Sequence, residues 1–221
     1  MNTLRLRGFA ILLAAAAAVV ASSAAAQLAP GISGHPGIRY MGEEEIWWSI
    51  RQLGDCLART RRSASMAMLA TVAGSPEEDR ATRAVLGNNT SCLQPNSRMR
   101  VGREVIRAAV AEALYRRNFA GPPPAQPFQE PEGGAPVPLL LDFAQCYAQT
   151  RPAEVHQLLA TTRLGSRDEH QALARLAPTL GSCLVAGVRF EFSAAVVRLA
   201  LAEALYQRAR LLLPMQPQRV R

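Results

Sequence analysis

The chain has 221 residues, with 25 basic against 17 acidic side chains and a formal net charge of +8 at pH 7. Every basic residue is an arginine, and acidic residues are interleaved with the arginines so that no long basic block forms. We therefore expect no nucleic-acid partner, and the length suffices for one large domain or two small ones.

Residues 1–26 predict a bacterial signal peptide of the Sec type. Arg5 and Arg7 precede an apolar run over residues 9–20, and three alanines stand just before Gln27, where a signal peptidase would cleave. The apolar run is shorter than the roughly 20 residues that span a membrane. We therefore expect no transmembrane segment after cleavage and a periplasmic or secreted protein; the alternative is an uncleaved anchor or a buried N-terminal helix.

The rest of the chain contains an internal repeat. Residues 111–117 (AEALYRR) recur 91 positions later as residues 202–208 (AEALYQR), whereas the shift is 90 upstream of Thr71. The change in shift predicts one extra residue in the second copy after the position of Thr71 and before that of Gly74. We infer a tandem duplication, which divides the chain into these segments: a flexible N-terminal segment (27–42), module 1 (43–118), a Pro/Gly-rich linker (119–138), module 2 (139–213) and a tail (214–221).

Three helices are predicted at the start of each module. In module 1, Ile46, Ile50, Leu53 and Leu57 recur at spacings of four and three, which places them on one helix face, and residues 140–150 repeat the pattern. Short second helices are expected near residues 65–72 and 153–162. The third helices begin with the pattern Ser-x-x-Glu of a capping box, at residues 75–78 and 166–169.

A fourth, alanine-rich helix ends each module, over residues 102–118 and 193–212. Besides its main apolar face, it carries a second apolar face that includes Ala108 and Tyr115 in the first copy and Leu199 and Tyr206 in the second. A helix that is apolar nearly all round is usually buried on two sides. We expect this helix at the centre of its own module rather than at a contact between modules, and the whole fold to be all-α.

Four cysteines at matching positions of the two copies predict a disulfide framework in an exported protein. A module that folded before duplication had only its own two cysteines to join, so we expect Cys56–Cys92 and Cys146–Cys183. The chain has no Cys-x-x-Cys motif, and its histidines have no counterparts between the copies. We therefore expect neither a cofactor nor a metal site.

Two glutamates shared by the copies are the candidates for buried ion pairs. Glu112 and Glu203 lie at the edge of an apolar helix face, where an arginine fork would restore lost hydration. Within each module the candidate partners are as follows: Arg61 or Arg98 for Glu112, and Arg151 or Arg189 for Glu203.

The motif content favours a binding protein over an enzyme. The chain has no phosphate-binding glycine loop, nucleophile elbow or zinc-protease motif. The first hypothesis is a non-catalytic binding or structural factor of the cell envelope, with an envelope protein or an anionic envelope component as its partner. The alternative is an enzyme or a carrier of an apolar ligand, with a site between the modules that involves Glu112, Glu203 and the shared arginines.

Overall fold

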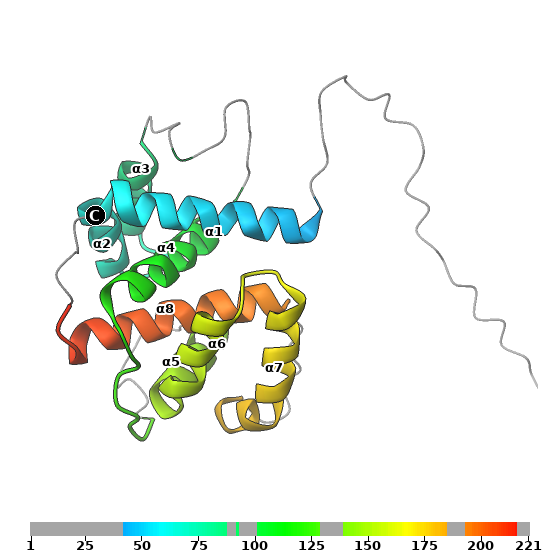
Figure 1. Ribbon diagram of the computed structural model, residues 1–221. Coiled ribbons are helices and arrows are strands. Elements are labelled where there is room, and N and C mark those ends of the chain that lie inside the picture. Colours follow the sequence, from blue (N-terminus) through cyan, green and yellow to red (C-terminus); the bar gives the residue numbers. More distant parts are fainter. Residues whose placement is uncertain (1–41, 88–91, 93–100, 129–138, 185–192, 216–221) are drawn as a thin grey trace, which may run out of the picture. The chain divides into compact units, whose positions relative to one another are not determined.

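The computed structural model describes residues 42–87, 92, 101–128, 139–184 and 193–215 (Figure 1). Within these ranges the chain forms α-helices and 3-10 turns and contains no strand, as predicted. The expected signal peptide, the segment before residue 42, the second half of the linker and the last six residues lie outside the described part. No helix in the described ranges is long and apolar enough to cross a membrane.

Four helices lie before the linker and four follow it. The first set is α1 (Glu43–Thr60), α2 (Arg62–Ala70), α3 (Pro76–Leu86) and α4 (Arg103–Asn118). The second set is α5 (Leu139–Thr150), α6 (Pro152–Thr161), α7 (Arg167–Leu180) and α8 (Ala194–Leu212), with the 3-10 turn η2 (Gly181–Cys183) after α7. The short helices α2 and α6 begin earlier than the sequence pattern predicts, directly after single residues that end α1 and α5.

The predicted capping boxes set the starts of α3 and α7. The Ser75 hydroxyl accepts a hydrogen bond from the backbone N–H of Glu78 at 3.1 Å, and Ser166 accepts one from Glu169 at 3.2 Å. Both glutamate side chains turn back and accept from a glycine N–H that precedes the serine. These contacts fix two buried carboxylates beside the loops α2–α3 and α6–α7.

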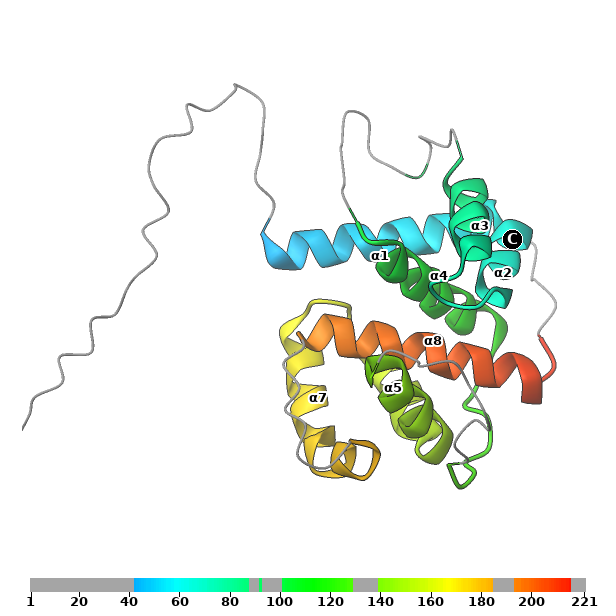
Figure 2. The ribbon, with the colours of Figure 1, turned by 180° about the vertical axis from the view of Figure 1, so that it is seen from behind.

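The long helices α4 and α8 pack against each other, with α1 on the other side of α4 and α5 on the other side of α8 (Figures 1 and 2). Ala108 of α4 and Leu199 of α8 belong to one buried apolar cluster. The expectation that the second apolar face lies only at the centre of its own module is therefore wrong. A helical pattern reveals that two faces are covered, but it does not say which neighbour covers each face.

Both disulfides pair as predicted. Cys56 is bonded to Cys92 and Cys146 to Cys183, each with a Cα–Cα distance of 5.6 Å. The first bond ties α1 to the segment after α3, and the second ties α5 to the turn η2. Each half is thereby held by one covalent clamp at equivalent places.

The first ten residues after α4 pack on the second half of the chain. Phe119 is buried, with its ring 6.3 Å from that of Tyr206. The backbone N–H of Gln126 donates to the carbonyl of Gln149 at 3.0 Å, and the Gln149 side chain donates to the carbonyl of Pro127 at 2.7 Å. These contacts bring the segment 119–128 alongside α5 and α8.

Candidate functional site

The two shared glutamates form ion pairs across the contact between α4 and α8. Glu112 of α4 accepts hydrogen bonds from Arg198 of α8, and Glu203 of α8 accepts one from Arg107 of α4. Neither glutamate pairs with Arg61 or Arg151, so this part of the prediction is wrong. A carboxylate at the edge of an apolar face meets whichever helix covers that face, and here that helix belongs to the other half.

Two of the four arginines expected as partners lie elsewhere in the described part of the chain. Arg61 is exposed in the short connection between α1 and α2. Arg151 lies between α5 and α6 and bonds to Glu154 at 2.8 Å. Arg98 and Arg189 fall outside the described residues.

Each buried arginine also binds the end of a short helix. The Arg107 guanidinium donates to the carbonyls of Met68, Leu69 and Thr71 at 2.8, 3.2 and 3.0 Å, and it lies 3.4 Å from the Glu78 carboxylate. The last carbonyls of a helix have no partner inside the helix and carry partial negative charge. Arg107 therefore holds the end of α2 against α4.

Arg198 repeats this arrangement at the end of α6. It donates to the carbonyls of Leu158, Leu159 and Thr162 at 3.2, 3.3 and 3.2 Å, and also to the Thr162 hydroxyl. Thr162 thus has the role that Thr71 has in the first half, 91 positions earlier. The contacts of the two arginines thus match at a shift of 90 for the carbonyls of Met68 and Leu69 and at a shift of 91 for that of Thr71.

Glu112 is closed off by a second arginine. Its carboxylate receives bonds of 3.1 and 2.9 Å from Arg198, and Arg116 lies 3.5 Å away. Arg116 also bonds to Asp55 of α1 at 2.7 Å, which fixes it over the carboxylate. Burial alone would raise the pKa of Glu112, but the charges of Arg198, Arg116 and Arg51 outweigh it and lower that pKa.

Within the part of the chain that the structure describes, no second arginine lies beside the Glu203 carboxylate. Gln207 stands where Arg116 stands 91 positions earlier, and it donates to the carbonyl of Leu69 at 2.7 Å. Among the described residues, Arg107 is the one donor to the Glu203 carboxylate, through Nε at 2.5 Å. Burial therefore dominates and raises the pKa of Glu203, and the nearby Glu78 adds to the rise. The side chain is 10% exposed, against 2% for Glu112.

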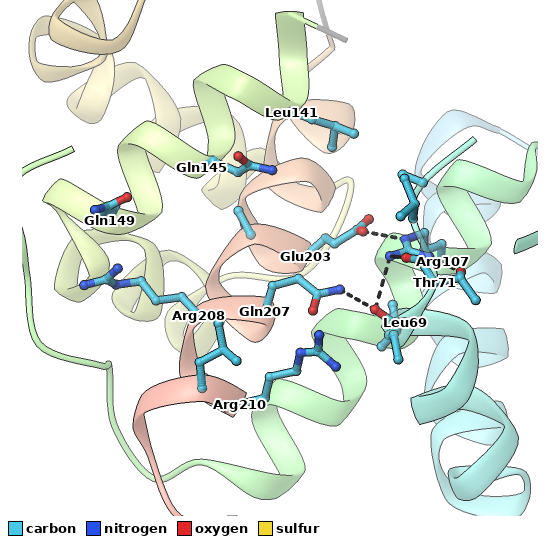
Figure 3. Close-up of a pocket in the computed structure, with 15 residues that line it drawn as sticks. Leu69, Thr71, Arg107, Leu141, Gln145, Gln149, Glu203, Gln207, Arg208 and Arg210 are labelled. Carbon is cyan, nitrogen blue, oxygen red and sulfur yellow. Dashed lines mark hydrogen bonds and ion pairs between the residues drawn. The ribbon is translucent and has the colours of Figure 1, made fainter. Parts of the chain in front are cut away.

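Glu203 and Arg107 lie in the wall of a cavity of about 460 Å³. Figure 3 shows the Glu203 carboxylate bound to Arg107 on one side of the cavity, glutamines along α5, and arginines farther along α8. A cavity of this size falls in the range that binds small ligands. Besides the ion pair, its polar lining consists of these residues: Thr71, Gln145, Gln149, Gln207, Arg208 and Arg210.

A second cavity of about 290 Å³ adjoins the same ion pair. Its exposed surface is mainly apolar and includes Val105, Leu140 and Leu199 of α4, α5 and α8. The charged residues Glu78, Arg103 and Glu104 also line it. Ala73, Arg107, Leu141 and Glu203 line both cavities. The ion pair thus lies between a cavity of mixed polar and apolar lining and a mainly apolar one.

The equivalent region beside Glu112 is filled by side chains. Leu164 stands where Ala73 stands 91 positions earlier, and it is buried together with Ile50. The side chain of Trp47 covers Gly165 so closely that a Cβ there would lie 2.5 Å from it, whereas a Cβ on Gly74 would meet nothing within 4 Å. Position 137, which corresponds to Trp47 at a shift of 90, lies outside the described residues.

The groups around Glu203 are suited to binding. The larger cavity has one carboxylate and no histidine, cysteine or serine in its lining. His156 bonds to the Tyr115 hydroxyl at 2.9 Å, and neither His156 nor His170 lines either cavity. No cluster of histidine, cysteine, aspartate or glutamate in the described ranges could hold a metal ion.

Sequence reasoning identified Glu203 but not the residues that make its surroundings differ from those of Glu112. Ala73, Leu141 and Gln207 replace Leu164, Arg51 and Arg116 at corresponding positions. A comparison of the positions at which the two halves differ would have found them.

No family model matches the chain, and searches of curated proteins and of solved structures find no match.

Proposed function

We propose that this chain is an exported, duplicated helical protein that binds a small ligand, without transforming it, in the cavities beside Glu203. One observation carries the proposal: two corresponding buried ion pairs have opposite surroundings. The pair at Glu112 is covered by a second arginine and by packed apolar side chains. The pair at Glu203 adjoins two cavities.

Duplication is supported by the way in which contacts recur. Both disulfides, both capping serines and both arginines that bind a helix end lie at positions separated by 90 or 91 residues, apart from the shift change noted above. Such agreement between long-range contacts does not arise from shared composition. Under this proposal, the ion pair of Glu112 stabilises the fold, and a ligand binds beside the ion pair of Glu203.

Export is supported by the disulfides, because such bonds persist in oxidising compartments and are rare in the cytosol. Mass spectrometry of the protein from a periplasmic extract should give a chain that begins at Gln27 with both disulfides formed. A chain that keeps residues 1–26 and fractionates with membranes would contradict this part of the proposal.

Binding without catalysis is supported by the contacts that Arg107 already makes inside the protein. Arg107 is engaged with α2, Glu78 and Glu203 and has little capacity left for a substrate. Acid–base catalysis needs a second group to exchange protons with the reacting atoms. An enzyme that uses Glu203 as its acid is the second candidate, favoured by the raised pKa of this carboxyl group.

The proposal is tested by two substitutions that give the surroundings of Glu203 the side chains found beside Glu112. We call the surroundings of Glu112 the closed site and those of Glu203 the open site. Ala73→Leu introduces the leucine found at 164, and Gln207→Arg introduces the arginine found at 116. Thermal unfolding is measured with a library of periplasmic metabolites, peptides and amphiphiles. Compounds that stabilise the wild-type protein should fail to stabilise either variant.

Arg80→Gln serves as the matched control, because Arg80 is exposed on α3 and pairs with Glu77 away from both cavities. It should respond to every compound as the wild type does. If no compound stabilises the wild type, or if both variants respond as it does, the binding proposal is wrong.

A further inference from the structure

We infer that the ligand is a short peptide with free ends and an apolar first residue. Its amino group would lie on Glu203, its carboxylate on Arg210, and its first side chain in the apolar cavity. This inference rests on the proposed binding function and names the chemistry of the same site. It follows from the order of charges along α8 and from the cavity that Glu203 shares.

The charge order is set by helix geometry. Glu203, Gln207 and Arg210 follow one another at spacings of four and three, which places them on one face of α8. Seven residues of α-helix rise about 10.5 Å. An extended chain advances about 3.3–3.6 Å per residue, so three residues cover this distance. The length of a tripeptide therefore matches the spacing of positions 203 and 210 along α8.

The acidic end accepts an ammonium group. One bond from Arg107 leaves the Glu203 carboxylate with unused acceptor positions, and part of it is exposed to the larger cavity. Charge-assisted hydrogen bonds from an ammonium group are stronger than those between neutral groups. An acetylated amine would keep its N–H but lose this charge.

The basic end receives a carboxylate. Arg210 is exposed, and both it and Arg208 line the larger cavity. Arg208 donates to the carbonyl of Pro124 through one nitrogen, so Arg210 is the arginine with more donors available. Figure 3 shows the two side chains on the part of α8 that lies beyond Gln207.

The glutamines between the two ends suit peptide groups. The Gln149 and Gln207 side chains each use an N–H in a bond to a backbone carbonyl, which leaves their amide oxygens to accept from a ligand. Gln145 is exposed on the same wall. Amide side chains can both donate to and accept from the backbone of an extended peptide.

The apolar cavity sets the preference for the first residue. Glu203 is part of its lining, so the side chain next to an amino group bound there lies at this cavity. Ala73 leaves the space that Leu164 fills in the other half. A leucine side chain transferred from water to such a cavity improves binding by roughly 10- to 100-fold relative to alanine.

The test is calorimetric titration of the full mature protein with Leu-Ala-Ala and three derivatives. N-acetylation and replacement of the first residue by alanine should each weaken binding at least tenfold. Amidation of the carboxyl end should weaken it several-fold, with a smaller effect in high salt. A peptide that binds equally well in all four forms would overturn the inference.

Three variants assign each effect to its residue. Glu203→Gln should bind the free and the acetylated peptide with equal affinity. Arg210→Gln should bind the peptide acid and the peptide amide with equal affinity. Ala73→Leu should lose the preference for leucine as the first residue. Arg80→Gln should keep all three differences. Ala73 is exposed, so Ala73→Leu keeps the test valid if Glu203→Gln folds poorly.

The outcomes separate the inference from the binding proposal. If no peptide binds but other compounds stabilise the wild type and fail with Ala73→Leu, the peptide inference is wrong and the binding proposal stands. If neither peptides nor other compounds bind, both are wrong.

Discussion

Replacement of Glu112 by glutamine should destabilise the fold far more than the same change at Glu203, although the two residues correspond in sequence. Glu112 is almost fully buried and receives two bonds from Arg198, and Arg116 lies beside it. Glu112→Gln leaves the fully buried guanidinium of Arg198 and the half-buried one of Arg116 facing an amide. Breaking a buried pair in this way costs about 3–5 kcal/mol.

The corresponding cost at Glu203 is smaller. This carboxylate receives a single bond from Arg107, which keeps its contacts with Glu78 and with the end of α2. The amide oxygen of Glu203→Gln can still accept that bond. Because the bond is weakened rather than removed, the loss should stay below the roughly 1.5–3 kcal/mol that one hydrogen bond with a charged partner contributes.

Urea unfolding at pH 7, followed by circular dichroism, measures both losses. Glu77→Gln is the control, because Glu77 is exposed on α3; its unfolding midpoint should stay close to that of the wild type. Equal costs at the two glutamates, or a larger cost at Glu203, would refute the reasoning that the two sites have different surroundings.

Three further predictions concern pH, the disulfides and the loop glycines. The pKa of Glu112 is lowered, so its contribution to stability is present above the usual value of 4.5 and is lost as the pH falls below it; the cost of Glu112→Gln should therefore shrink at pH 3–4. The pKa of Glu203 is raised, so its contribution to stability is lost as the pH rises above 4.5. In the same unfolding assay, Glu203→Gln should therefore cost more stability at pH 4 than at pH 7. If the costs of the two substitutions change with pH in the same direction, the two pKa shifts are not opposite. Serine in place of both cysteines of the first disulfide, which are 36 residues apart, should reduce the unfolding free energy by about 4 kcal/mol on the loop-entropy scale, and an unchanged urea midpoint would exclude a structural clamp. Gly74→Ala and Gly165→Ala both place alanine at positive φ, but only the alanine at 165 collides with the Trp47 side chain. Gly165→Ala should therefore lower the melting temperature more than Gly74→Ala does. Equal changes in melting temperature would contradict the packing of Trp47 on Gly165.

Local elements of this fold could be predicted from the sequence because local chemistry determines them. The four-and-three spacing of Ile50, Leu53 and Leu57 places these residues on the buried face of α1. Ser75 and Ser166 cap their helices because a serine hydroxyl can satisfy an orphan N–H at any helix start. The cysteine pairing was predicted from the proposed duplication, under which each cysteine has its partner in its own half.

The partners of Glu112 and Glu203 could not be predicted in this way. Their pairing depends on how α4 and α8 pack together, and a helical pattern does not specify which helix covers a face. The candidate site had the same difficulty. Its cavities result from small or uncharged side chains at Ala73 and Gln207, and such residues attract notice only when their larger counterparts are seen to fill the same space.

The most direct test of the account is to measure the reactivity of the two carboxylates in the folded protein. The wild type is treated with a carbodiimide and a small amine, which convert accessible carboxyl groups to amides, and the products are mapped by mass spectrometry. Glu77 and the fully buried Glu169 give the upper and lower limits of reactivity.

The account predicts labelling of Glu203 well above that of Glu112, and protection of Glu203 by the substitution Gln207→Arg. Equal labelling of the two glutamates in the wild type, or labelling of Glu203 that Gln207→Arg leaves unchanged, would contradict the claim that one of two corresponding ion pairs is open to a ligand.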